Sequence, residues 1–219
     1  MRDPKRPEVI NAVNEGIRKA QEDYAKAYMS HISSTYAPEY LMTVYIFQSI
    51  LELKEKCNCT YGLSLEQPVY EIVRSLGVRG RYAEEARVYG DCDLLLRDIK
   101  DKPMAVIEVK KYAWDYPKDL PRLSYLVGKG LEFGIFASCW YEEIKGSDRK
   151  DAEDRLNEEV QCIYEHIKKE DVMRRYNGLI VERELGRVDT LVLEGETSSQ
   201  KEERRWCPVC FVIRRKRRR

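Results

Sequence analysis

Two strand-like runs joined by a short polar linker constrain this chain more than any other feature. The runs read VYGDCDLLLRD and PMAVIEVKKY, at residues 88–98 and 103–112. The linker DIKDK is polar and typical of a turn. Apolar runs of this length on either side of a turn are typical of adjacent antiparallel strands. We therefore expect a β-hairpin with the character of central strands.

Side-chain alternation separates an aliphatic face of this hairpin from a charged one. Successive residues of a strand point to opposite faces, so Asp91 and Asp93 share one face of the first strand. Glu108 and Lys110 share one face of the second strand for the same reason. A symmetric hairpin centred in the linker places Asp93 opposite Glu108, with Cβ atoms about 5 Å apart. Asp91 opposes Lys110 in this register, which a β-bulge would disrupt.

The opposed acids predict a metal-dependent reaction centre. Carboxylates at this separation repel each other unless a cation lies between them, and Mg²⁺ is a hard ion that prefers oxygen ligands. Such an ion lowers the pKa of a bound water and polarises a phosphate. Asp93 and Glu108 would hold the metal, and the carbonyl of Val109 would add a ligand. Lys110 would stabilise the attacking hydroxide or the charge on the phosphorane, which completes the groups that phosphodiester hydrolysis requires.

This arrangement resembles the signature of the PD-(D/E)xK nuclease superfamily. The segment DCDLLL contains Asp93, and fourteen residues separate Asp93 from the triplet Glu108-Val109-Lys110. The resemblance implies that Asp93 begins the second core strand, that the triplet lies on the third, and that a glutamate of the preceding helix assists the metal. Glu39, in PEYLMTVYIFQSILEL, matches that glutamate best. The similarity covers about residues 36–141, and the proline of the signature is absent.

The resemblance implies a restriction-endonuclease-like fold of the α/β (α+β) class, with a mixed central sheet flanked by helices. It implies hydrolysis of phosphodiester bonds with Mg²⁺, or with Mn²⁺ in its place; DNA is favoured over RNA as the substrate, and the sequence does not decide between them. Asp93, Glu108, Lys110 and Glu39 would be the catalytic residues. The alternative is a catalytically inactive protein of this fold that binds nucleic acid or acts as a scaffold. Many such nucleases work as dimers, so a homodimer is compatible with this assignment.

Other interpretations of individual residues stay open at this point. Asp93 and Glu108 could be solvated strand ends, although the aliphatic runs beside them favour a central position. Asp91 could bind the metal or pair with Lys110. The position of Glu39 near a helix N-terminus needs no catalytic explanation, because the helix dipole alone favours an acid there. Glu66, on a predicted strand, could be the assisting acid instead. Arg122 could contact a phosphate, but a surface position is the favoured interpretation.

Periodicity along the rest of the chain predicts alternating helices and strands. Amphipathic or apolar spacing indicates helices, and a period of two indicates strands. We expect one domain over residues 1–195, followed by a polar linker and basic tail at 196–219. The predicted helices are 8–30, 38–56, 115–128 and 148–170; the further strands are 61–67, 131–141 and a pair within 179–194 about a turn at Gly186.

Charge and composition restrict the class of protein without identifying a partner. Lys and Arg number 39 and Asp and Glu 38, so net charge argues neither for nor against nucleic acid binding. No segment is apolar and long enough to suggest a membrane span. The N-terminus lacks the apolar run of a secretory signal. Seven cysteines without such a signal indicate a reducing compartment, which we take to be the cytoplasm.

Two further features are considered for metal and phosphate binding. Cys207-Pro-Val-Cys210 has zinc-knuckle spacing, but a closed site needs four ligands. The other pair, Cys57 and Cys59, is distant in sequence, so zinc or an iron–sulfur cluster at these four cysteines is disfavoured, although some members of the superfamily hold such a cluster. The basic block at the end of the chain, IRRKRRR, could bind phosphates non-specifically or be a solvated tail.

Overall fold

The computed structural model describes the backbone of residues 2–28, 36–79, 82, 84, 87–144, 151–170, 173, 175–176, 178–194 and 201–216. Within this part of the chain, seven strands form one sheet in the order β1-β2-β3-β4-β7-β5, with β6 also paired to β7. Strands β3 and β4 are parallel and the other pairs are antiparallel. The strands are β1 Gly62–Pro68, β2 Asp91–Arg97, β3 Pro103–Tyr112, β4 Phe133–Ile144, β5 Leu179–Leu185, β6 Asp189–Glu194 and β7 Lys201–Arg215.

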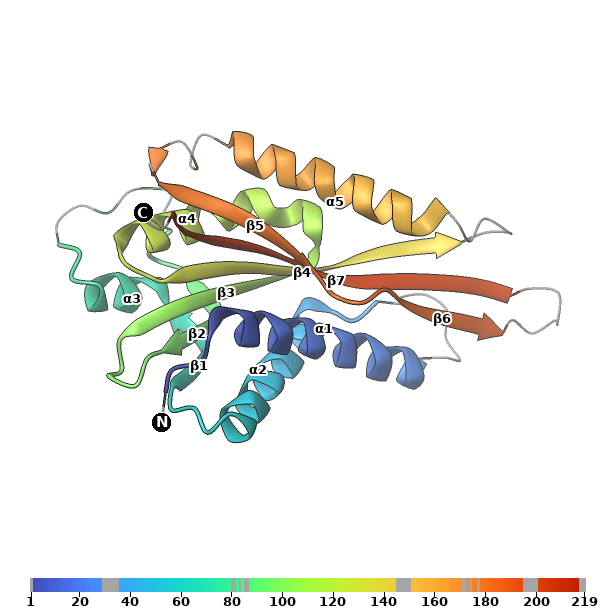
Figure 1. Cartoon of the computed structure of the whole chain (residues 1–219), viewed down its shortest axis with the longest axis horizontal. Helices are drawn as coiled ribbons and strands as arrows, with labels where there is room; N and C mark the ends of the chain where they lie inside the picture. The colour runs from blue at the N-terminus through green and yellow to red at the C-terminus, as the bar shows by residue number, and fades with distance from the viewer. Residues whose placement is uncertain are drawn as a thin grey trace.

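Helices cover both faces of this sheet (Figure 1), which confirms the predicted α/β (α+β) class with a mixed sheet flanked by helices. Figure 1 shows α1 and α2 below the sheet, and α4 and α5 above it. Because an α-helix buries one stripe and a sheet has two faces, this three-layer arrangement buries apolar surface on both sides of the strands. The helices are α1 Arg6–Tyr28, α2 Glu39–Lys56, α3 Val69–Ser75, α4 Leu120–Lys129 and α5 Asp151–Lys169, with a 3₁₀ helix η2 at Ala113–Lys118.

The central strands divide the hydrophobic core into two clusters. Leu94 of β2 and Ile107 of β3 are fully buried in the cluster that includes α1 and α2. Leu95 and Val106 are fully buried in the opposite cluster, with α4 and α5. This is the alternation expected of strands, because consecutive side chains point to opposite faces. Both faces are apolar, so β2 and β3 are central strands as predicted.

The register of the β2–β3 hairpin agrees with the prediction. Leu94 pairs with Ile107, and Leu95 pairs with Val106. Continued by one residue, this register sets Asp93 opposite Glu108. The turn is closed by Asp98, whose Oδ1 accepts 2.8 Å hydrogen bonds from two backbone amides of the linker. A register shift lies at the turn end of β2, away from the candidate site.

The helix expected at 115–128 is divided in two. The 3₁₀ helix η2 spans Ala113–Lys118 and α4 begins at Leu120. Pro117 inside η2 has no amide hydrogen to donate, so a continuous α-helix through it would lose a hydrogen bond. Pro121 lies in the first turn of α4, where that missing donor costs nothing. Asp119 therefore stands at the start of α4, next to the end of β3.

Residues 201–215, expected to be linker and tail, form strand β7 instead. This strand lies between β4 and β5, and its stretch from Trp206 to Ile213 is buried. A strand covered on both faces has a continuous apolar run. In β7 this run is WCPVCFVI, and charged residues flank it on both sides in the sequence. The two short strands expected within 179–194 are present as β5 and β6. Both pair with β7, so residues 201–215 belong to the sheet.

The close packing of α1 on α2 gives a test of this arrangement. A Cβ at Gly16 would lie 2.5 Å from the Cα of Ile46 and 2.6 Å from its nitrogen. We expect Gly16→Ala to lower the free energy of unfolding by about 1–3 kcal/mol because the helices must separate. Alanine is otherwise the better helix former, by about 1 kcal/mol.

Urea denaturation measures this effect, and Asn11→Ala on the exposed side of α1 is the matched control. We expect the control to be as stable as the wild type or slightly more stable. A Gly16→Ala variant with wild-type stability would contradict the close approach of α1 to α2 at Ile46.

Candidate active site

The four residues predicted to be catalytic lie together where β2 begins and β3 ends. Glu39 is the first residue of α2, and its Oε1 lies 2.9 Å from the Nζ of Lys110. The Oδ2 of Asp93 lies 3.8 Å from the same nitrogen. Glu108 precedes Lys110 by two residues on β3. Glu39 is about half-exposed, whereas Lys110 is largely covered.

Asp93 is fixed by the backbone of the neighbouring strand. Its Oδ2 accepts a 2.7 Å hydrogen bond from the amide of Val109. The carbonyl of Val109 accepts a 2.9 Å hydrogen bond from Lys110 Nζ. Asp93 and Lys110 thus bind the two polar groups of a single residue, Val109, which lies between Glu108 and Lys110. The side-chain alternation predicted for the two strands therefore brings Asp93 and Lys110 to one site.

A second ion-pair network, which the sequence interpretation missed, holds Glu108. The Oε1 of Glu108 lies 2.7 Å from Nη2 of Arg122, and this nitrogen donates a 2.9 Å hydrogen bond to Asp119 Oδ1. Arg122 is only 4% exposed, so the favoured surface position was wrong. Residues three apart on a helix are neighbours, and the spacing Asp119-x-x-Arg122 at the start of an apolar helix was the available signal.

Further contacts tie this network to the ends of β2 and η2. Arg122 Nη1 donates a 2.9 Å hydrogen bond to the carbonyl of Asp91. Arg87 Nη1 lies 3.2 Å from Asp119 Oδ1 and 2.9 Å from the carbonyl of Lys118. Asp119 Oδ2 lies 3.5 Å from Lys110 Nζ and so joins the two networks. Asp119 and Arg122 thereby connect α4 to the charged ends of both strands.

Burial controls the protonation of Glu108. The side chain is 1% exposed. Burial raises the pKa of Glu108 to about 8, because loss of hydration and the charges of Asp93 and Asp119 together outweigh the attraction of Arg122. A large share of Glu108 therefore carries a proton at neutral pH when no further cation is bound.

Lys110 is charged at neutral pH. Burial opposes its charge, but the hydrogen bond with Glu39 and the charges of Asp93 and Asp119 outweigh burial, so the pKa of Lys110 is raised. An amine with a raised pKa does not act as a base at neutral pH. Lys110 can instead orient a water or stabilise negative charge, which is the role predicted for it.

Two residues considered at the sequence level lie outside these networks. Asp91 is exposed, and it holds Arg122 through its backbone carbonyl. The described ion pairs of Lys110 are with Glu39, Asp93 and Asp119 rather than with Asp91. Glu66 is exposed at a backbone φ of 48°, and no described contact joins it to the site. Of the two candidate assisting acids, Glu39 is the one in contact with Lys110.

Asp93 and Glu108 are the carboxylates of this site that could hold a divalent cation. In the described residues, no three His, Cys, Asp or Glu side chains converge as a complete ligand set. Glu108 Oε1 and Asp119 Oδ2 are nevertheless buried and accept no hydrogen bond, although Arg122 and Lys110 lie near them. Mg²⁺ keeps several waters and binds through one or two carboxylates together with substrate phosphate. Asp93 and Glu108, with the carbonyl of Val109, are suitable ligands of that kind.

The cysteines with zinc-knuckle spacing lie on opposite faces of β7. Cys207 packs in the cluster with α4 and α5, and Cys210 packs in the cluster with α1 and α2. Cys210 Sγ donates a 3.2 Å hydrogen bond to Asn14 Oδ1 of α1. All seven cysteines, Cys57 and Cys59 included, have free thiols. The sheet therefore separates the sulfur atoms of Cys207 and Cys210, which cannot share a metal in this arrangement.

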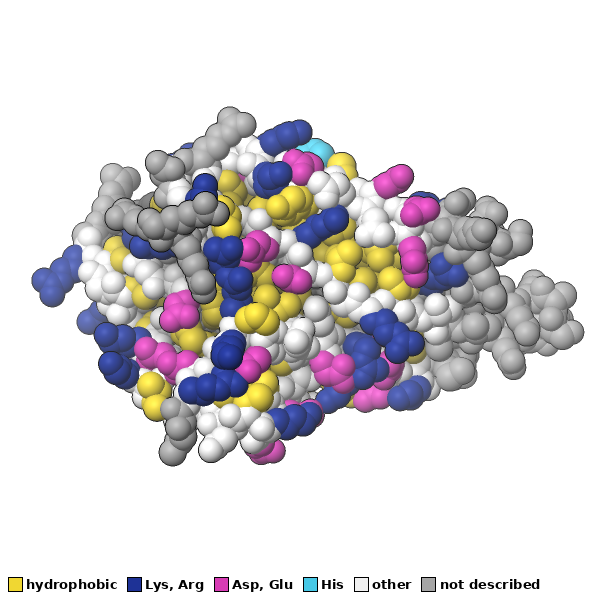
Figure 2. All heavy atoms as spheres, in the orientation of Figure 1, with side chains coloured by type: hydrophobic (Ala, Val, Ile, Leu, Met, Phe, Trp, Pro, Cys, Tyr) yellow, Lys and Arg dark blue, Asp and Glu magenta, His cyan; other side chains and the backbone are white. Residues whose placement is uncertain are grey.

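The basic block at the end of the chain is partly bound to the fold. Arg214 pairs with Glu182 of β5. Arg215 donates hydrogen bonds to the carbonyls of Val127 and Gly128 at the end of α4. Residues 217–219 lie outside the described residues. On the face drawn in Figure 2, Lys and Arg side chains are interspersed with Asp and Glu rather than gathered into one patch.

Comparison with known proteins assigns no family to the chain. No protein-family model, curated protein or solved structure matches it. Among the described helices, none is long and apolar enough to cross a membrane. The geometry of the site is therefore the basis for any proposal about function.

The protonation of Glu108 predicts a pH-dependent stability in metal-free buffer. The folded protein holds this proton up to about pH 8, whereas an unfolded glutamate loses it near pH 4.5. The folded state therefore binds more protons between these values, and the free energy of unfolding falls as pH rises through this window. We expect Glu108→Gln, which cannot titrate, to remove a decrease on the order of 3–4 kcal/mol between pH 5 and 8.

Urea denaturation with EDTA at pH 5, 6.5 and 8 measures the difference between the two proteins. The difference in free energy of unfolding between the wild type and Glu108→Gln isolates the titration of Glu108, because all other titratable groups are present in both proteins. We expect the variant to gain stability relative to the wild type as pH rises. Parallel pH profiles would show that Glu108 is ionised throughout and that its pKa is not raised.

Proposed function

We propose that this chain is a metal-dependent nuclease of the PD-(D/E)xK superfamily that hydrolyses phosphodiester bonds of DNA. The observation that carries the proposal is that the carboxylates of Glu39 and Asp93 converge on the Nζ of Lys110. Glu108 lies two residues before Lys110 on the same strand. The order of elements supports it: a helix with Glu39, a strand with Asp93, a strand with the triplet, then α4 and β4. These elements span the region of the sequence resemblance.

Each residue has a distinct part in the proposed reaction. A bound Mg²⁺ or Mn²⁺ would supply an activated water and polarise the scissile phosphate. Asp93 and Glu108 would hold the ion together with the carbonyl of Val109. Lys110 would orient the attacking water and stabilise negative charge on the phosphate. Glu39 holds the ammonium group of Lys110 toward this site.

Asp119 and Arg122 are positioning residues in this proposal. Arg122 holds the carboxylate of Glu108 from the side of α4, and Asp119 holds Arg122. A carboxylate held in this way loses less freedom on binding an ion than a mobile one, because its orientation is already set. We further propose that the protein acts in the cytoplasm, where a reducing environment suits its free thiols.

A second candidate function is binding of nucleic acid without cleavage. The observation that favours it is the neutralisation of the acids from within the chain. Glu108 is paired with Arg122, and Lys110 pairs with Glu39 and Asp93. If these pairs persist in the presence of Mg²⁺, the acids are not free to hold the ion.

Cleavage of linear DNA, circular DNA and RNA with Mg²⁺, Mn²⁺ or EDTA tests the proposal. The variants are Lys110→Ala and Asp93→Asn; the asparagine keeps an oxygen that accepts the hydrogen bond from Val109. We expect metal-dependent cleavage of DNA by the wild type and a loss of about 100-fold or more in each variant, because charge stabilisation in the transition state has this magnitude. Lys102→Ala, an exposed lysine of the hairpin turn, is the control that retains activity.

The outcomes separate the two functions. Cleavage retained in both active-site variants would refute the assignment of the site. No cleavage by the wild type, together with retained binding of DNA, would favour the second candidate. Cleavage of RNA alone would keep the site and correct the substrate.

A further inference from the structure

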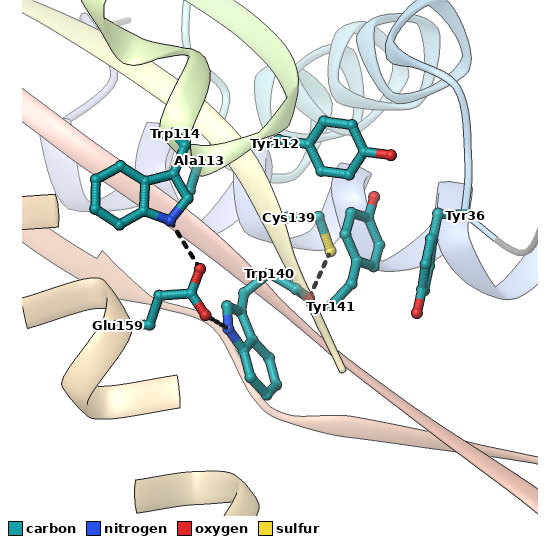
Figure 3. A pocket seen from close by; sticks show the side chains of 8 residues that line it. All are labelled: Tyr36, Tyr112, Ala113, Trp114, Cys139, Trp140, Tyr141 and Glu159. Carbon is teal, nitrogen blue, oxygen red and sulfur yellow. Dashed lines mark hydrogen bonds between the residues drawn. The ribbon is translucent and has the colours of Figure 1, made fainter. Parts of the chain in front are cut away.

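A pocket of about 270 Å³ lies beside the candidate active site, and most of its lining is aromatic. Figure 3 shows Tyr36, Tyr112 and Tyr141 on one side of it, and Trp114 and Trp140 on the other. The ring centroids of Tyr36 and Tyr141 are 3.8 Å apart, and those of Tyr112 and Tyr141 are 6.3 Å apart. These contacts place a group of flat apolar surfaces around one opening.

Glu159 of α5 fixes the two indole rings. Its Oε1 accepts a 2.9 Å hydrogen bond from Trp114, and its Oε2 accepts a 2.8 Å hydrogen bond from Trp140 (Figure 3). Both carboxylate oxygens are therefore engaged with the walls of the pocket. Apart from this hydrogen-bonded carboxylate, a planar ligand would meet mostly aromatic faces, so the pocket is suited to stacking more than to selection by hydrogen bonds.

The chain itself connects this pocket to the active site. Tyr112 follows Lys110 by two residues on β3, with a shift in the pairing register between them. Tyr36 precedes Glu39 by three residues, and the Oε1 of Glu39 lies 2.9 Å from Lys110 Nζ. Trp114 lies on η2, which leads directly to Asp119. The segments that carry the reacting groups thus also form the walls of the pocket.

Several exposed aromatic side chains lie close in sequence to the same residues. Tyr112 is 49% exposed and Trp114 is 45% exposed, although both carry large rings. Tyr40 follows Glu39 and is 73% exposed, and Tyr89 precedes Asp91 by two residues and is fully exposed. Aromatic rings left in water beside a charged site need a reason, and stacking on the bases of a nucleic acid strand is one that requires no particular base.

We propose that this aromatic pocket binds the base of an unpaired nucleotide next to the scissile phosphate. The inference rests on the proposed function and specifies its substrate as single-stranded or locally unpaired nucleic acid. A base inside a duplex is stacked and paired, so it reaches such a pocket only after leaving the helix. The phosphate of the same strand would then lie at Lys110. Every base has an aromatic face, so the pocket accepts bases with little preference for sequence.

Binding without cleavage tests the pocket separately from the reaction. The probes are a fluorescently labelled single-stranded DNA oligonucleotide and its matching duplex, titrated with the full chain in EDTA and followed by fluorescence anisotropy. We expect the wild type to bind the single strand more tightly than the duplex. Tyr112→Ala and Trp114→Ala should each weaken single-strand binding about tenfold, since each removes one stacking surface.

Two further variants guard against a general loss of structure. Trp114→Phe keeps an aromatic face but loses the hydrogen bond to Glu159, and we expect it to retain most of the binding. Ile99→Ala removes an exposed apolar side chain from the turn at the other end of the hairpin, and it should bind as the wild type does. Thermal melting of each variant checks that it folds.

The results distinguish failure of this inference from failure of the proposed function. Wild-type affinity in both alanine variants, or equal affinity of the wild type for duplex and single strand, overturns the base pocket even if cleavage depends on Lys110. The expected binding pattern in a chain that cuts no substrate supports the pocket and refutes the nuclease.

Discussion

The buried contact between Glu108 and Arg122 is the interaction on which the rest of the site depends. It joins the middle of the sheet to α4, and both side chains are nearly inaccessible to water. A buried guanidinium is tolerated only when acceptors surround its N–H groups, and Glu108 is one of three that Arg122 contacts. Arg122 also binds Asp119 and the carbonyl of Asp91. One guanidinium group therefore sets the relative positions of β2, β3 and α4.

The acidic side chains around this contact lower the stability of the fold, because they are crowded together in a largely buried place. Burial raises the pKa of Glu108, and the nearby charges of Asp93 and Asp119 raise it further. Packing alone would favour apolar residues at such buried strand positions, and a cluster of this kind is expected where a site serves a reaction. The same region carries exposed rings, among them Tyr112 and Trp114. The proposed phosphate site and the proposed base pocket therefore lie on the same segments of chain.

The hairpin could be predicted from sequence because its information is local. Alternation on β2 and β3, with a short symmetric linker, determined which residues face one another. Asp119 and Arg122 could not be found in this way, because their roles depend on the break at Pro117 and on the path of the chain over β3. Strand β7 was missed because charged residues flank its buried apolar run on both sides, which made the segment look like a polar linker and a basic tail. Cys207 and Cys210 resembled a metal motif until their strand placed them on opposite faces.

The position of β7 has a consequence for the order in which the protein folds. Strand β4 pairs with β3 on one edge and with β7 on the other, and β7 begins 57 residues after β4 ends. A ribosome adding 5–20 residues per second needs about 3–12 s to cover that distance. During this interval the apolar edge of β4 is open to other chains. All the residues proposed for catalysis are then already synthesised, but the sheet that supports them is incomplete, so aggregation competes with folding at this stage.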